Sequence, residues 1–384
     1  MSWLYSILIL LSPVTALSAA PSADQLKQIK LPPGFQITVF AEADNARQLA
    51  LSPAGTLFIG SRHAGNVYAV PNALTLLKAE QTKPVKAQLI ASRLSQPSGV
   101  AFREGTLYVA AISEIVTFPD IEKHLGGKPT PKVLETKFPP DVHHGWKHIE
   151  IGPDGLLYVP VGAPCNICLS NDKIYASIAR MTLDGKNREV IAHGVRNTLG
   201  LDWHPRTKEL WFTDNGRDLW GDDRPGDELN RVAQTGTHFG YPFCHDMGLN
   251  DPEFGKNKDC TAKGPYQFPA LRLGPHVAAL GIKFYRGEQF PATYKGKLFI
   301  AEHGSWNRNN KIGYRIMTVD VSANGRKASN YKVFAEGWLQ GESAWGRPTY
   351  LLELPDGSFL LSDDAAGVIY RISYEGKKAP ATKK

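Results

Sequence analysis

Hydrophobic residues gather in short strand-like runs, and each run begins directly after a turn signal rich in Gly, Pro or Asp. Six copies occupy residues 52–60, 103–110, 152–160, 204–213, 294–301 and 355–362. Their equivalent bulky residues, at spacings of 50, 50, 53, 88 and 61, are Phe58, Tyr108, Tyr158, Trp211, Phe299 and Leu360. A period near 50 residues with turn–strand–turn–strand content is typical of a β-propeller.

Six copies predict an all-β chain folded as a six-bladed β-propeller. Several copies continue into a second run, as at residues 65–70 and 367–372. We expect the propeller to span residues 21–374. The interval of 88 residues predicts an insertion at about residues 214–274, on the face where the central funnel opens. A functional site is expected first in that region.

Composition supports a folded chain with many turns. The 384 residues are 42% hydrophobic, which excludes wholesale disorder, and 63 of them are Gly or Pro. The formal charge is +7, of which +3 falls in residues 375–384, a predicted flexible Lys-rich tail. The remaining +4 fits an anionic small ligand and gives no argument for nucleic acid.

The first 20 residues predict an exported protein. They carry no charged side chain, and an apolar run at 3–11 is followed by small residues up to Ala20. This pattern is typical of a secretory signal peptide cleaved after Ala20, and predicts a periplasmic or secreted location. The alternative is an uncleaved membrane anchor. No later segment is apolar enough to cross a membrane, so no stable membrane insertion is expected after cleavage.

Four cysteines agree with export. An even number in an exported chain suggests two disulfides, and the favoured pairing is Cys165–Cys168 with Cys244–Cys260. The competing interpretation is a four-cysteine zinc site, which the long distance between the two pairs disfavours.

Several polar motifs are candidates for chemistry. A neutral histidine can accept a proton near pH 7, so the pair His143–His144 is a candidate for a base, or else two structural histidines. Arg196 and Asn197 offer donors to carboxylate or quinone oxygens, unless Arg196 is an ordinary blade-edge residue. Residues 212–230 form a Gly/Asp-rich loop that suits Ca²⁺ or is a solvated acidic loop.

Two further motifs pair aromatic surface with cations. Residues 302–308, together with Lys311, and residues 345–348 have this character. Such pairs suit a flat, anionic, conjugated ligand, and their candidate contacts are Trp306, Arg308, Lys311 and Arg347.

Taken in order, these motifs resemble the soluble glucose/sorbosone dehydrogenase family, and most closely its sorbosone-dehydrogenase-like branch, which also carries a Cys-Asn-x-Cys segment. Members are six-bladed propellers that use pyrroloquinoline quinone (PQQ) and Ca²⁺. The resemblance implies that His144 is the catalytic base and that Arg196 and Asn197 lie near the reactive quinone carbonyl. It also implies a cofactor-carboxylate contact from Arg347, with Lys311 or Arg308 in place of a cofactor-binding Lys.

The same resemblance implies a calcium site. The backbone carbonyls of Gly216 and Arg217 match positions that hold the cofactor calcium, and Asp227 and Glu228 match an acidic pair near calcium. The better-known glucose dehydrogenases have Asp at the position of His143, and Gly-Pro at the position of Gly216-Arg217. These departures leave the sugar specificity and the pKa of the base open.

The expected function is oxidation of an aldose sugar or a sorbosone-type aldehyde by hydride transfer to the quinone. His144 would act as general base, and Arg196 would stabilise negative charge on oxygen. The electrons would pass to an acceptor that the sequence does not identify. Two alternatives remain, a calcium-dependent propeller lactonase and a non-catalytic ligand-binding propeller.

Overall fold

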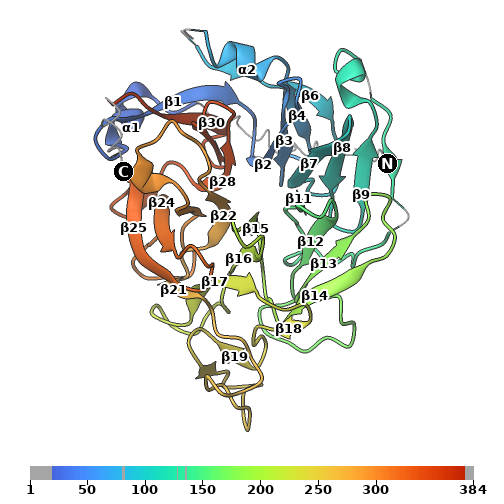
Figure 1. Ribbon diagram of the computed structural model, residues 1–384, viewed down its shortest axis with the longest axis vertical. Coiled ribbons are helices and arrows are strands. Elements are labelled where there is room, and N and C mark those ends of the chain that lie inside the picture. Colours follow the sequence, from blue (N-terminus) through green and yellow to red (C-terminus); the bar gives the residue numbers. More distant parts are fainter. Residues whose placement is uncertain (1–19, 80–82, 128, 135, 377–384) are drawn as a thin grey trace, which may run out of the picture.

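Six sheets stand in a ring in the computed structural model, which describes residues 20–79, 83–127, 129–134 and 136–376 (Figure 1). Their strands pair antiparallel, except for one parallel pair at the edge of each of two sheets. This arrangement confirms the all-β, six-bladed propeller expected from the repeat. The predicted signal peptide, apart from Ala20, and the predicted tail, apart from residues 375 and 376, lie outside the described residues.

The first three blades follow one another along the chain, apart from the outermost strand of blade 3, which comes from residues 237–238. Each blade runs from its innermost strand outward. Blade 1 contains β2 (Ala46–Leu51), β3 (Leu57–Ser61), β4 (Val67–Val70) and β6 (Gln88–Ala91). Blade 2 contains β7 (Gly99–Arg103), β8 (Thr106–Ala110), β9 (Ile115–Phe118) and β10 (Lys132–Val133). Blade 3 contains β11 (Glu150–Ile151), β12 (Leu157–Val161), β13 (Ser177–Met181), β14 (Glu189–His193) and β18 (Thr237–His238).

The last three blades complete the ring. Blade 4 contains β15 (Gly200–Trp203), β16 (Leu210–Asp214), β17 (Gly226–Val232) and β21 (Leu271–Pro275). Blade 5 contains β22 (Ala279–Phe284), β23 (Leu298–Glu302), β24 (Arg315–Val321) and β25 (Ala328–Glu336). Blade 6 contains β28 (Pro348–Glu353), β29 (Phe359–Asp363), β30 (Val368–Tyr374), β1 (Phe35–Glu42) and β5 (Val85–Lys86).

The repeated bulky residues all lie in the second strand of a blade and are buried. They form the cores between neighbouring blades. Phe58 and Phe118 pack between blades 1 and 2, and Phe299 and Phe359 pack between blades 5 and 6. A single sheet cannot cover both of its apolar faces, so each blade is stabilised by its neighbours.

Strand β1 closes the ring in a way that the repeat did not indicate. It pairs antiparallel with β30, from Phe35 opposite Tyr374 to Glu42 opposite Val368. The amino-terminal and carboxy-terminal parts of the propeller therefore share blade 6, and the outer edge of β30 is covered.

Helical segments are short. They are α1 (Ala23–Gln28), α2 (Ala73–Leu76) and the 3₁₀ turns η1 (Ile121–His124) and η2 (Ala292–Tyr294). A capping box between Ser22 and Gln25 begins α1. Within the described residues, none of these helices has the length and apolar character needed to cross a membrane.

The region predicted as an insertion holds the blade 4 strand β17 and most of β21. Between them runs an excursion from residue 233 to residue 270, in which β18 adds an edge to blade 3. The excursion carries the small hairpin of β19 (Cys244–His245) and β20 (Leu249–Asn250), which lies beyond the ring of blades (Figure 1). A second small hairpin, β26 (Leu339–Gln340) with β27 (Ser343–Ala344), precedes blade 6. Disulfides join Cys165 to Cys168 and Cys244 to Cys260, as favoured from the sequence, so the four-cysteine zinc alternative is wrong.

Candidate active site

A cavity of about 320 Å³ lies where the innermost strands begin. Its walls come from segments that precede first strands, such as Arg196 before β15 and Arg347 before β28, and from segments that follow second strands, such as Arg62 after β3 and Gly216 after β16. Because first and second strands are antiparallel, these segments meet at the same edge of each blade. Five of the six blades contribute, so residues far apart in sequence surround one space.

His144 is held with one ring nitrogen committed to the backbone. Its Nδ1 lies 2.9 Å from the carbonyl oxygen of Ala163, so Nδ1–H donates and Nε2 carries the free electron pair. Burial and the nearby charge of Arg196 lower the pKa of His144 well below its ordinary value. The imidazole is therefore neutral at pH 7 and can accept a proton at Nε2.

The backbone around His144 is tightly constrained. His144 has a φ of 51°, a left-handed conformation that non-glycine residues rarely adopt. A Cβ on Gly162 would lie 2.5 Å from the Cβ of His144, so this close approach requires glycine. The buried side-chain nitrogen of Lys147 donates to the carbonyl oxygens of Ile112 and Gly145 and fixes the same turn.

Arg196 and Asn197 are fixed by a buried carboxylate. The backbone N–H groups of Arg196 and Asn197 donate to the two oxygens of Asp214, at 2.8 and 2.6 Å. The Arg196 guanidinium also contacts Asp218 at 2.7 Å and the carbonyl oxygen of Asn215 at 3.1 Å. Both predicted side chains line the cavity together with His144.

Two arginines of the cavity, Arg47 and Arg62, were not among the predicted site residues. The guanidinium of Arg62 stacks on Trp146, with its central carbon 3.4 Å from the ring centre, and burial together with Arg47 lowers its pKa to about 9. Arg47 pairs with Asp364 at 2.5 Å, and its buried Nε has no partner in the described residues. No motif marks either residue, although Arg62 lies two residues after the predicted run 52–60, at the end of a strand where blade-edge residues converge.

The predicted calcium residues separate into two groups. Gly216 and Asp227 line the cavity, and the Gly216 N–H donates to Asp227 at 3.0 Å. Burial raises the pKa of Asp227 to about 7. Glu228, the next residue on β17, faces away and accepts from the Asp246 N–H and from Asn230, because successive strand residues point to opposite faces.

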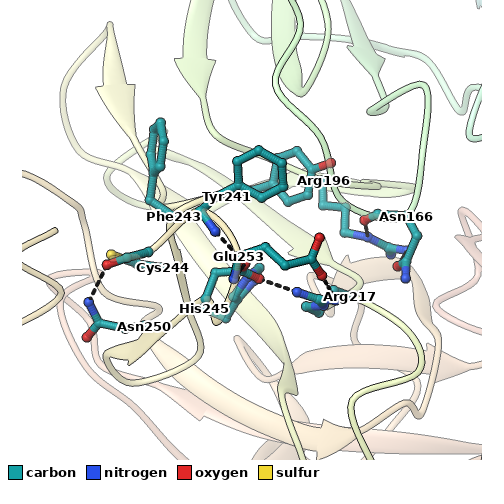
Figure 2. Close-up of polar contacts among 12 residues, drawn as sticks. Asn166, Arg196, Arg217, Tyr241, Phe243, Cys244, His245, Asn250 and Glu253 are labelled. Carbon is teal, nitrogen blue, oxygen red and sulfur yellow. Dashed lines mark hydrogen bonds and ion pairs between the residues drawn. The ribbon is translucent and has the colours of Figure 1, made fainter. Parts of the chain in front are cut away.

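The side chain of Arg217 points away from the cavity toward the excursion. Its guanidinium pairs with Asp251 at 2.5 Å and with Glu253 at 2.9 Å, and Asp251 also contacts His245 (Figure 2). Arg217 is therefore not part of the cavity wall, although its neighbours Gly216 and Asp218 are. Among the described residues no cluster of three or more His, Cys, Asp or Glu side chains could hold a metal ion.

The comparisons with known proteins agree with this architecture. The TrAA12-like family model matches residues 29–375. The chain belongs to the TrAA12-like family. A protein of Borreliella burgdorferi, itself uncharacterised, is 34% identical over 361 residues, which cover 90% of this chain and 91% of that protein.

Two solved structures are similar in fold to this TrAA12-like chain. The holo PQQ domain of a pyranose dehydrogenase from Coprinopsis cinerea has a TM-score of 0.71 at 17% identity, covering 90% of this chain and 97% of that one. The PQQ-bound aldose sugar dehydrogenase of Streptomyces coelicolor has a TM-score of 0.61 at 20% identity, covering 90% and 99%. At these identities the likeness concerns the fold.

In this TrAA12-like chain the remaining predicted cofactor contacts do not all meet. Arg347 lines the cavity and donates to the carbonyl oxygens of His303 and Gly304. Trp306 lines it as well, and 66% of its surface is exposed. Arg308 instead contacts Asp222 and Asp223, and Lys311 contacts Glu342, so neither belongs to the cavity wall.

Proposed function

We propose that this chain is a PQQ- and calcium-dependent dehydrogenase that oxidises an aldose sugar or a sorbosone-type aldehyde. One observation carries the proposal: the unprotonated Nε2 of His144 stands in a cavity that four arginines line. A base beside an unusual density of positive charge suits a site that deprotonates a hydroxyl next to an anionic cofactor. Solved structures of this fold include PQQ-bound dehydrogenases, which supports the assignment.

The cavity residues fit PQQ, which has three carboxylates. Arg62 and Arg347 carry positive charge with no carboxylate partner within ion-pair distance among the described residues, and Arg47 keeps an unpartnered Nε. These three residues would hold the carboxylates, and Trp306 would cover a conjugated ring at the cavity mouth. When bound, PQQ supplies the two-electron acceptor for the hydride.

The loop that follows β16 fits Ca²⁺ held by backbone oxygen. A Cβ on Gly216 would lie 2.8 Å from Pro225, so the glycine lets this loop pack closely. Among the described residues no hydrogen bond engages the carbonyl oxygen of Gly216 or Arg217, and Ca²⁺ accepts backbone carbonyls as ligands. These carbonyls would hold the ion, and Asp227 would add negative charge nearby.

His144 would take the proton of the substrate hydroxyl at Nε2, while Nδ1–H stays bonded to Ala163. Arg196 would place positive charge beside the oxygen that becomes negative. The departures from the better-known glucose dehydrogenases, His143 and Arg217, concern the cavity wall and the Ca²⁺ loop. We therefore propose that this chain belongs to the sorbosone-dehydrogenase-like branch. The assay below identifies the individual sugar.

The proposed location is periplasmic or secreted, with the signal peptide removed after Ala20. Mass spectrometry of the chain purified from the periplasm or the medium checks it, because a mature amino terminus at Pro21 is expected. A mature chain that still begins at Met1 would contradict cleavage.

Reconstitution tests the function. The apoprotein is loaded with PQQ and Ca²⁺, and reduction of an artificial dye is followed with a panel of aldoses and sorbosone. Turnover is expected to need PQQ, Ca²⁺ and one class of sugar. His144→Ala should lower kcat by about 10²- to 10⁴-fold with PQQ binding retained. The matched control is His193→Ala, at the end of β14 and outside this cavity.

The outcomes separate the candidates. PQQ binding without turnover would mean that the panel lacks the substrate. Full turnover by His144→Ala would remove His144 from the mechanism. A chain that binds no PQQ would contradict the proposal and move the function to the lactonase or the binding propeller.

A further inference from the structure

The Cys165–Cys168 disulfide closes a ring of four residues beside the cavity, and Asn166 lies within it. Asn166 contacts the Arg196 guanidinium twice. Its carbonyl oxygen accepts from Nε of Arg196 at 2.8 Å, and its Oδ1 accepts from Nη2 at 2.8 Å (Figure 2). Two contacts on two different nitrogens fix the plane of the guanidinium as well as its place.

Asn166 also holds the loop that follows β16. Its Oδ1 accepts from the Asp218 N–H at 2.8 Å, and its Nδ2 donates to the Asp218 carbonyl oxygen at 3.0 Å. The Asp218 carboxylate in turn pairs with Arg196. Asn166, Arg196 and Asp218 therefore form a closed triangle, and Asp218 and Arg196 are both on the cavity wall.

The ring itself is anchored from behind by Tyr241. The buried hydroxyl of Tyr241 accepts from the N–H of Cys168 at 3.0 Å and lies 3.5 Å from Sγ of Cys165. The disulfide limits the backbone freedom of Asn166, and Tyr241 limits movement of the ring as a whole. An amide held in this way is preorganised for Arg196 before any ligand enters.

We propose that Asn166 is a positioning residue for Arg196, and that the Cys165–Cys168 ring exists at this place to present it. The inference rests on the proposed function, because it assigns Arg196 a part in turnover. Without Asn166, only the Asp218 carboxylate and the Asn215 carbonyl oxygen would hold the Arg196 guanidinium, and its Nε–H would lose its partner. Asn166 acts through Arg196 and has no reacting atom of its own.

The kinetic test uses Asn166→Ala in the PQQ- and Ca²⁺-loaded full chain. We expect kcat to fall by about 10- to 100-fold and KM to change by less than about threefold. The matched control is Asn250→Ala. Asn250 lies within the other disulfide loop and donates to the carbonyls of Gly255 and Lys258, with no arginine contact. An equal loss of kcat in both variants would overturn the proposal.

A double-mutant cycle tests whether the loss of kcat in Asn166→Ala depends on Arg196. In an Arg196→Lys background, Asn166→Ala should lower kcat by less than about threefold, because residues that act as a unit are not additive. A full second loss in that background would show that Asn166 acts independently of Arg196 and would contradict the proposal.

A readout without turnover separates this inference from the proposed function. In protein labelled with [¹⁵N]arginine, the Nε–H signal of Arg196 is assigned by its absence in Arg196→Lys. We expect slow hydrogen exchange at this Nε–H in the wild type and in Asn250→Ala, and exchange at least tenfold faster in Asn166→Ala. If no sugar is oxidised but hydrogen exchange at this Nε–H is at least tenfold faster in Asn166→Ala, the positioning contact stands and the dehydrogenase assignment fails. Unchanged exchange overturns the positioning role.

Discussion

Two buried polar clusters lie on the same innermost strands. They differ in whether each charged group has a partner of opposite charge. The inner cluster consists of Gln48, Glu150, Asp202, Lys283 and Tyr350, contributed by β2, β11, β15, β22 and β28. The cavity lies nearer the amino ends of β15 and β22, where Leu199 and Ala278 are part of its wall. Both clusters place charged groups where solvent is largely excluded.

In the inner cluster every charge faces an opposite one. The Lys283 ammonium lies 3.7 Å from Glu150 and 3.9 Å from Asp202, and Arg286 also pairs with Asp202. Burial alone would lower the pKa of Lys283, but the adjacent Glu150, Tyr350 and Asp202 raise it above its ordinary value. Charges that are paired in this way join neighbouring blades and leave no unpaired charge to bind a ligand.

In the cavity the positive charges outnumber their partners. Arg62 faces the positive groups Arg47 and Arg347, and burial together with Arg47 lowers its pKa. Uncompensated buried charge destabilises a folded protein, and such groups are concentrated where a ligand or a reaction needs them. Pairing of charges, rather than their burial, therefore distinguishes the structural cluster from the functional one.

Removing the cation of the inner cluster should have the largest effect. Lys283→Met leaves the buried carboxylate of Glu150 without its ion-pair partner. We expect the free energy of unfolding to fall by about 3–5 kcal/mol, measured by urea denaturation. Lys297→Met is the matched control, since Lys297 pairs with Asp320 at a partly exposed position, and it should cost at most about 1 kcal/mol. Equal losses of unfolding free energy in the two variants would contradict a structural role for the buried Lys283–Glu150 pair.

Removing a cation of the cavity should have little effect on the free energy of unfolding but should weaken the binding of PQQ. Arg62→Met deletes a positive charge that lies among other positive charges, so the free energy of unfolding should fall by less than about 1 kcal/mol or rise. Affinity for PQQ should fall by about 10- to 100-fold, the loss expected for one charged hydrogen bond of about 1.5–3 kcal/mol. Equilibrium dialysis measures the affinity, with Arg180→Met, an arginine paired outside the cavity, as control. Unchanged affinity would place the carboxylates elsewhere.

The sequence could predict what local patterns determine. Turn signals before apolar runs indicated all six second strands, because each run must bury one bulky residue between blades. The His143–His144 pair and the Gly-Val-Arg-Asn segment were found for a similar reason, since their chemistry is visible in adjacent residues. Local patterns also favoured both disulfides.

Features that depend on closing the ring could not be predicted in the same way. Arg47 and Arg62 stand as single residues in or beside strands and meet His144 only in space. The pairing of β1 with β30 joins the two ends of the propeller and leaves no local signal. Arg308 and Lys311 resemble cofactor contacts in sequence, but Asp222, Asp223 and Glu342 hold them outside the cavity.

The smallest expected effect concerns His148, which lies between the two clusters. Its Nδ1–H donates to the Leu199 carbonyl oxygen at 2.7 Å, its buried Nε2 has no partner in the described residues, and burial and Arg47 lower its pKa to about 3. Below about pH 6.5 the unfolded chain binds a proton at this residue that the folded chain does not bind. Stability due to His148 is therefore lost progressively as the pH falls from about 6.5 toward 3.

The slope assigned to His148 is at most about 1.4 kcal/mol per pH unit, since one proton is involved. His148→Gln keeps an amide donor for the Leu199 carbonyl oxygen and removes the titrating group. Urea denaturation of both proteins between pH 6 and pH 5 should show a dependence on pH that is shallower in the variant by about this amount. An unchanged slope would mean that the folded protein protonates His148, and that the boundary between the two clusters tolerates a further positive charge.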